Sequence, residues 1–272
     1  MSAERRSIGP VARRCAALAA VSALALAVHA APAPAGGTGG GRQARPSSLY
    51  PGPSVSIMVV GAGNVILVQP EQISVAATAV STSHGTCGIA AATALAALVD
   101  LRRVGGPPFS IRDYGHCTSS PRNSGQLFVY SLDGETNHGQ NGWEYKVDNR
   151  SGTTGAGDTS GPQGNGRLLA NGARVLWFWC QSFGGGCQRT LEVRAPATVA
   201  RGSAMSVSVV GYDNAGHARS MPGARVWIGA SAAVTGSSGT ATLRAPSKTG
   251  PLGVRASRPG SVPSFPDVVQ VR

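Results

Sequence analysis

Four side chains suited to metal or proton chemistry occur in two short pairs, His84 with Cys87 and His116 with Cys117. Thiolates and imidazoles are preferred zinc ligands, and two of each would complete a tetrahedral site. Cys87 could instead be a nucleophile, with His84 or His116 as its base. The third option is a disulfide. His116 and Cys117 are sequence neighbours whose side chains diverge on an extended chain, which argues against the metal.

A second candidate is the aromatic pair Trp143 and Tyr145 in the run GWEYKV, which would share one face of a strand. The chain has only four Trp, five Tyr and five Phe in 272 residues, yet Trp177, Phe178 and Trp179 also follow one another. Core packing, a platform for a glycan or flat ligand, and a catalytic role could each explain the clustering. We favour core packing because large aromatics dominate small cores. Trp143 and Tyr145 remain weak candidates for ligand binding.

The sequence contains no recognisable catalytic motif. G-x-S-x-G and H-E-x-x-H are both missing, and GAGNV after the first expected strand is only a fragment of a phosphate-binding glycine motif. We therefore expect no catalytic residues, no cofactor and no metal, and interpret the chain as a protein that is not an enzyme.

The first 30 residues have the pattern of a secretory signal peptide. Arginines at positions 5, 6, 13 and 14 precede an apolar run over 16–28, and Val28 and Ala30 provide small residues before a cleavage point. The apolar run is shorter than the roughly 20 residues that a membrane span needs. We predict a secreted or cell-surface bacterial protein without a transmembrane segment, exported by either the general or the twin-arginine route.

Removal of residues 1–30 would discard Cys15 and leave an even number of cysteines, at 87, 117, 180 and 187. In an oxidising compartment this predicts two disulfides, for which three pairings are possible. We favour Cys180–Cys187 across the glycine-rich QSFGGG, and by elimination Cys87–Cys117. The zinc and thiol-nucleophile interpretations become the minor alternatives.

Residues 31–53 are rich in Gly and Pro and predict a disordered linker. The first domain, 54–190, should open with the strand SVSIMVVG, followed by possible strands at NVILVQP and ISVAATAV. A helix is expected over Cys87–Leu101, capped by Thr86. Further strands are expected at PFSIRDYG, GQLFVYSL, GWEYKVDN and ARVLWFWC. The segment 150–166 looks too polar and glycine-rich to pack, which predicts a surface loop.

Residues 191–272 form a second, differently charged domain. Seven short β-type runs separated by Gly, Pro, Asn and Ser predict a β-sandwich, with Trp227 packed between its sheets. Residues 194–272 hold nine basic and two acidic side chains, whereas 53–193 hold nine of each. Arg outnumbers Lys by 22 to 2, which we attribute to a GC-rich genome rather than to nucleic-acid binding.

The stretch from Thr86 to Cys180 resembles the transcobalamin-type C-terminal domain, a β-grasp-like module of exported and surface proteins of Gram-positive bacteria. The resemblance depends on TALAAL, SLDG at 131–134, GWEYKV at 142–147, and the last strand with Trp177 after Asn171-Gly172. It implies an α+β, β-grasp-like fold. In its namesake the module covers a corrinoid, but no position here demands a corrin, so the resemblance implies fold rather than ligand.

The second domain resembles bacterial immunoglobulin-like modules of surface proteins, on the runs SVSVVGYDNAGHARSMPGARVWIG, GSSGTATLRAP and VRASRPG. We thus expect a mainly β chain, an α+β domain followed by an all-β sandwich. The expected function is non-catalytic binding or adhesion at the cell envelope or outside the cell. Expected partners are an envelope polymer, a glycan or a small ligand, but no nucleic acid, and the basic domain could contact anionic surfaces peripherally. The alternatives are a structural spacer and a diverged extracellular hydrolase.

Overall fold

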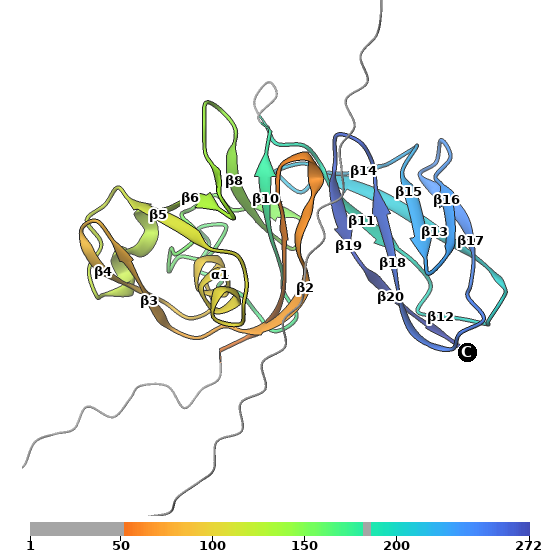
Figure 1. The fold of residues 1–272 in the computed structure, drawn as a ribbon, viewed down its shortest axis with the longest axis horizontal. Helices are drawn as coiled ribbons and strands as arrows, with labels where there is room; N and C mark the ends of the chain where they lie inside the picture. Colours follow the sequence, from red (N-terminus) through yellow and green to blue (C-terminus); the bar gives the residue numbers. More distant parts are fainter. Residues whose placement is uncertain (1–51, 182–185) are drawn as a thin grey trace, which may run out of the picture. The chain divides into compact units, whose positions relative to one another are not determined.

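The computed structural model describes residues 52–181 and 186–272, in which strands predominate and one α-helix occurs (Figure 1). The prediction of a mainly β chain is confirmed. The predicted signal peptide and almost all of the predicted linker lie outside the described residues. We call residues 52–181 the first lobe and residues 186–272 the second lobe. No helix in these two segments is long and apolar enough to cross a membrane.

The main sheet of the first lobe has the order β2-β1-β10-β8-β9. At its centre β1 and β10 run parallel, and the outer strands pair antiparallel to them. Both central strands are nearly continuous apolar runs because both of their faces are covered. Two of the predicted strands merge, since NVILVQP continues into the start of ISVAATAV. The strands are β1 (Ser54–Val60), β2 (Ile66–Ser74), β8 (Gly142–Val147), β9 (Arg150–Ser151) and β10 (Arg174–Cys180), with the short 3-10 helix η1 (Ala62–Asn64) between β1 and β2.

The helix α1 (Ala94–Arg103) contributes fully buried Leu95 and Leu98 to the core beneath this sheet. Its N-cap is Thr93, whose hydroxyl oxygen accepts a hydrogen bond from the Ala96 N–H at 3.2 Å. The predicted start at Cys87, capped by Thr86, is therefore wrong. Both of those residues lie in a strand that forms a hairpin with the strand just before it and is bonded through Cys87 to Cys117, 30 residues away. These contacts override local helix propensity.

Two smaller sheets complete the first lobe. One is a hairpin of β3 and β4, and the other has the order β5-β6-β7. A disulfide between Cys87 and Cys117 joins β4 to the loop after β5, and Cys180 and Cys187 form the second disulfide, so both predicted pairings are confirmed. The elements are β3 (Thr78–Thr82), β4 (Gly85–Ile89), β5 (Phe109–Asp113), η2 (Pro121–Gln126), β6 (Leu127–Leu132) and β7 (Glu135–Thr136).

The segment 150–166 is irregular beyond β9, but the expectation that it does not pack is wrong. Ala156 and Pro162 are buried. The carbonyl oxygen of Ala156 accepts the Leu95 N–H at the start of α1, at 2.9 Å. The Thr154 carbonyl accepts the Tyr145 hydroxyl at 3.0 Å. The segment packs through its backbone, which its glycines leave accessible to close approach.

The second lobe consists of two sheets, with the orders β14-β13-β11-β19, in which β17 also pairs with β13, and β12-β20-β18-β15-β16. Each of the seven predicted runs forms a strand. They correspond to β11 (Thr190–Arg194), β13 (Ala204–Tyr212), β15 (Arg225–Ile228), β16 (Ser231–Val234), β17 (Thr240–Arg244), β18 (Gly250–Ser257) and β20 (Asp267–Val271). Three short strands add to them: β12 (Thr198–Val199), β14 (Ala218–Ser220) and β19 (Val262–Phe265).

Trp227 does not lie between the sheets, so that prediction is wrong. Its neighbours in β15, Val226 and Ile228, are fully buried in the core of the second lobe. Successive side chains of a strand point to opposite faces. Trp227 therefore lies on the outer face of its sheet, where it is half-buried.

The two lobes share a third apolar cluster, formed by the face of the main sheet opposite α1 together with β19. The cluster buries side chains from both lobes, so the two separate cores belong to one compact unit. Its buried members are Met58, Val60, Leu176, Phe178, Cys180 and Val262.

Candidate functional site

Trp143 and Tyr145 lie in the core of the first lobe, only 2% and 6% exposed. Trp143 is paired with Trp179 on β10, with the rings edge to face and their centroids 5.7 Å apart. Its indole N–H donates to the Glu135 carbonyl at 2.9 Å. Burial raises the pKa of Tyr145, although its hydrogen bond to the Thr154 carbonyl opposes that rise. Both residues pack as a sheet core, and neither ring forms an exposed platform.

The structure brings the four candidate metal ligands together, but around a disulfide. The rings of His84 and His116 lie 4.6 Å apart, and the sulfurs of Cys87 and Cys117 are bonded to each other. The disulfide therefore occupies the thiols that a zinc site or a Cys87 nucleophile would require. A fifth residue, Asp113, joins this group, and no motif in the sequence pointed to it.

Asp113 organises this cluster. Its carboxylate accepts the Cys117 N–H at 2.8 Å and the Gly115 N–H at 3.0 Å, and lies 3.3 Å from His84 Nδ1. Burial by itself would raise the pKa of Asp113, but the two backbone N–H groups and His84 together hold it below its ordinary value. This arrangement anchors the loop after β5 next to the disulfide.

The exposed aromatic residues of the first lobe lie on β5 and β6 rather than on β8. Alternation directs Leu127 and Val129 into the core, while Phe128 and Tyr130 point outward. Phe128 is 43% exposed and Tyr114, just after β5, is 65% exposed. Their ring centroids are 6.4 Å apart. We call Arg112, Tyr114, Phe128 and Tyr130 the aromatic face.

Arg112 shapes the aromatic face because it pairs with Phe128 across the strands. Its guanidinium carbon lies 3.4 Å from the centre of the Tyr130 ring, which holds both side chains in place. The result is a set of neighbouring planar groups in which the rings of Tyr114 and Phe128 remain open to solvent.

Polar groups border the aromatic face along a cleft of about 280 Å³. The hairpin between β7 and β8 contributes amides and an imidazole, and β8 contributes a carboxylate. Asn137 is held by its hydrogen bonds to the Val129 carbonyl and the Trp143 N–H. Burial raises the pKa of Glu144. The bordering side chains are Asn137, His138, Gln140, Asn141 and Glu144.

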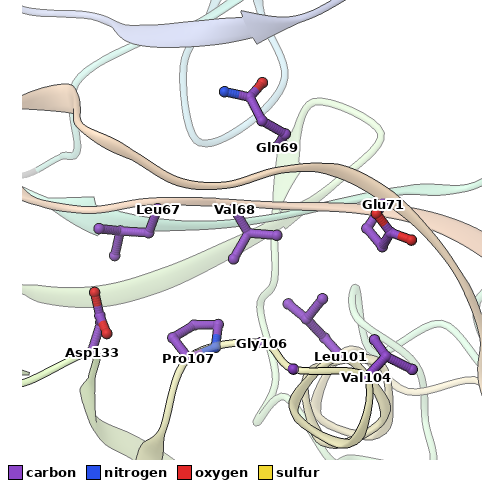
Figure 2. Close-up of a pocket in the computed structure, with 10 residues that line it drawn as sticks. Leu67, Val68, Gln69, Glu71, Leu101, Val104, Gly106, Pro107 and Asp133 are labelled. Carbon is purple, nitrogen blue, oxygen red and sulfur yellow. The ribbon is translucent and has the colours of Figure 1, made fainter. Parts of the chain in front are cut away.

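Figure 2 shows another cleft, of about 510 Å³, between β2 and the C-terminal end of α1. Leu67 and Val68 on β2 face Leu101 and Val104 across it (Figure 2). Two carboxylates border it from opposite ends, Glu71 on β2 and Asp133 after β6 (Figure 2). Gln69 also borders the cleft, but its side chain points toward the second lobe and accepts a hydrogen bond from Arg255. The cleft has apolar walls and acidic ends.

The aromatic face was missed in the sequence although both of its strands were predicted. In the sequence, Trp143 and Tyr145 stood out as possible ligand-binding aromatics. Phe128 and Tyr130 in GQLFVYSL have the same spacing of two residues and were equally good candidates. The alternation in that run separates Leu127 and Val129 from the two aromatics. Sequence alone could not show which of the two apolar faces is covered.

Comparison with known proteins adds no relative. The chain matches no protein-family model, no curated protein and no solved structure. Functional inference therefore depends on the sites themselves.

Proposed function

We propose that this chain is an exported, non-catalytic binding or adhesion protein of the bacterial cell envelope or the extracellular space. Two disulfides support an oxidising location, because such bonds persist chiefly outside the cytoplasm. The pattern of residues 1–30 supports export. Together these features limit the partners to envelope components and extracellular molecules.

We propose a β-grasp-like, transcobalamin-type fold for the first lobe. The parallel pair β1 and β10 at the centre of a mixed sheet, with a single helix against one face, supports it. For the second lobe we propose an immunoglobulin-like sandwich, supported by two sheets over one apolar core. These folds carry many functions, so the choice of ligand depends on side chains.

We propose that the ligand of the first lobe is a glycan, bound across the aromatic face. The observation that carries this proposal is the exposure of Tyr114 and Phe128 next to each other on one sheet. Contiguous exposed apolar patches often mark binding sites. The flat apolar face of a sugar ring can cover an aromatic ring, while its hydroxyls need polar partners. The amides and carboxylate along the cleft supply those partners.

The test is a binding screen of the protein against envelope glycans, with cobalamin included as the competing ligand. The double variant Tyr114→Ser/Phe128→Ser should lose at least about tenfold in glycan affinity, because each lost aromatic contact is worth about 1 kcal/mol. Val65→Ser removes an equally exposed apolar side chain elsewhere and should leave affinity unchanged. Equal loss in both variants, or binding of cobalamin alone, would refute the glycan proposal. If none of the screened ligands binds, the structural-spacer alternative would be favoured.

A second candidate function is the hydrolase, which one observation favours: Glu71 and Asp133 border the same cleft. Two carboxylates on either side of a bond can act as acid and base in glycoside hydrolysis. Release of reducing sugar from the bound glycans would support it, provided that Glu71→Gln and Asp133→Asn each abolish the release. Glycan binding without turnover would leave the binding function alone.

A further inference from the structure

We propose a second binding site on the outer face of the second lobe, at Trp227 and Arg225, which takes a sugar carrying a negative group, a carboxylate or a phosphate. This site is separate from the aromatic face of the first lobe. Its residues take no part in the binding of a glycan by the aromatic face.

Trp227 is placed to contact a ligand. It pairs with Ala232 on β16 and with Arg255 on β18. The small Ala232 leaves one side of the indole uncovered, and a hollow of about 400 Å³ opens there. The lining residues are Arg225, Trp227, Gly229, Ala230, Ala232 and Ser257. Only small side chains accompany the indole and the guanidinium, so the hollow can admit a ring over Trp227.

Arg225 supplies the charge. It is two residues before Trp227 on β15, so both side chains lie on the same outer face. The guanidinium is exposed, and among the described residues it forms no ion pair and donates no hydrogen bond. An unpaired guanidinium next to an aromatic plane can bind a carboxylate or phosphate through two parallel hydrogen bonds.

The surrounding charges select an anion. Among the residues that the structure describes, no acidic one lines the hollow. The two acidic residues of 194–272 are engaged elsewhere. Asp213 lies 3.3 Å from Arg189 and 3.5 Å from His217, and Asp267 accepts the Ala195 N–H at 2.8 Å. Nine basic side chains in the same segment add a positive field that raises the local concentration of anions.

The combination of the Trp227 indole with the Arg225 guanidinium favours an anionic glycan over a simple polyanion. Charge alone would recruit any polyanion to any exposed arginine of this lobe. The indole adds a contact that needs a ring, so a charged sugar can engage both groups at once, whereas a polyanion without rings can engage only the guanidinium. Binding should therefore require the sugar and the charge together, and should weaken with salt because exposed charges are screened.

The probes form a matched set on one backbone: dextran, carboxymethyl-dextran and phosphodextran, with polyphosphate as the polyanion without sugar. Affinity is measured with the full chain, by calorimetry at low and high salt. We expect the protein to bind both charged dextrans and not to bind uncharged dextran. The charged dextran that binds with the higher affinity shows whether a carboxylate or a phosphate is preferred. Trp227→Ala and Arg225→Gln should each weaken binding at least about tenfold, the typical loss on removing one strong contact. Trp227→Phe, which keeps a ring, should retain most of the affinity. That retained affinity would show that the second lobe still folds when the indole is removed.

The control is Arg219→Gln, which removes the same charge from an exposed position on β14, in the other sheet. It should change the affinity less than about threefold, because only the general field is reduced. Equal losses in Arg219→Gln and Arg225→Gln would overturn the site in favour of diffuse attraction. Polyphosphate binding that depends on Trp227 would overturn the requirement for a sugar. Loss of charged-dextran binding in Tyr114→Ser/Phe128→Ser would assign it to the first lobe instead.

Discussion

The ammonium group of Lys146 lies 2.9 Å from the backbone carbonyl oxygen of Asp213, which joins β8 of the first lobe to the end of β13 in the second. Lys146 is 1% exposed, and its other partners are the Tyr212 carbonyl at 3.1 Å and the Thr190 hydroxyl at 3.2 Å. Burial lowers the pKa of Lys146 to about 8. Three hydrogen bonds therefore hold a desolvated cation at the contact between the lobes.

Stability should consequently increase with pH across a defined range. Between pH 8 and the ordinary lysine pKa of 10.5, the unfolded chain keeps a proton that the folded one releases. The free energy of unfolding should therefore rise by about 1.4 kcal/mol per pH unit in that range. Denaturant melts between pH 8 and pH 9 measure this slope, since they stay below the ordinary tyrosine pKa of 10.0.

Lys146→Met should abolish most of the slope, because the lowered pKa of Lys146 is its source. The matched control is Lys248→Met, which removes the exposed lysine of the second lobe and should leave the slope unchanged. A slope that persists in Lys146→Met would show that another group controls it.

Trp143→Ala should lower the free energy of unfolding by about 3–5 kcal/mol, because it removes a large buried ring and its contact with Trp179. Trp143→Phe should cost less, since it keeps a ring at the same place in the core. Guanidinium denaturation of both variants measures the two losses. An unchanged midpoint for Trp143→Ala, together with lost ligand binding, would show that the residue acts in recognition.

The exported protein should contain no free thiol when it is denatured without reduction, because all four cysteines outside 1–30 are paired. Titration with a thiol reagent checks this. Cys87→Ala/Cys117→Ala should lower the stability by about 3.7 kcal/mol, the chain-entropy value for a loop of 30 residues. Two or more free thiols in the wild-type protein would contradict the pairing. They would favour the alternative of a metal site at His84, Cys87, His116 and Cys117.

Thr93→Ala should destabilise the protein by about 1 kcal/mol, because it removes the hydroxyl that accepts the Ala96 N–H at the start of α1. Thr86→Ala should change the stability by less than about 0.5 kcal/mol, because Thr86 lies exposed in β4. The two thermal or denaturant midpoints decide between the observed helix start and the one expected from local sequence. The reverse order of effects would favour a helix that begins at Cys87.

Local pattern by itself determined most of the longer strands and favoured the cysteine pairing that the structure has. Runs such as SVSIMVV and RVLWFWC have strong β propensity between glycine and proline breakers, and all seven runs of the second lobe became strands. The cysteine pairing followed from an even count and one short loop. The packing of Trp143 and Tyr145 followed from their size in a chain with few aromatics.

Tertiary structure alone decided which face of each strand is covered. Trp227 and Val226 are neighbours in one strand, yet Val226 points into the core and Trp227 points away from it. A strand with apolar residues on both faces is buried on whichever side meets its partner, and that partner lies far away in sequence. The start of α1 was decided by contacts within the first lobe, since the pairing of β4 with the neighbouring strand β3 and the bond from Cys87 to Cys117 hold extended a segment that local propensity favours as helix. The burial of Lys146 depends on contacts with Thr190, Tyr212 and Asp213, which come together only when the two lobes meet.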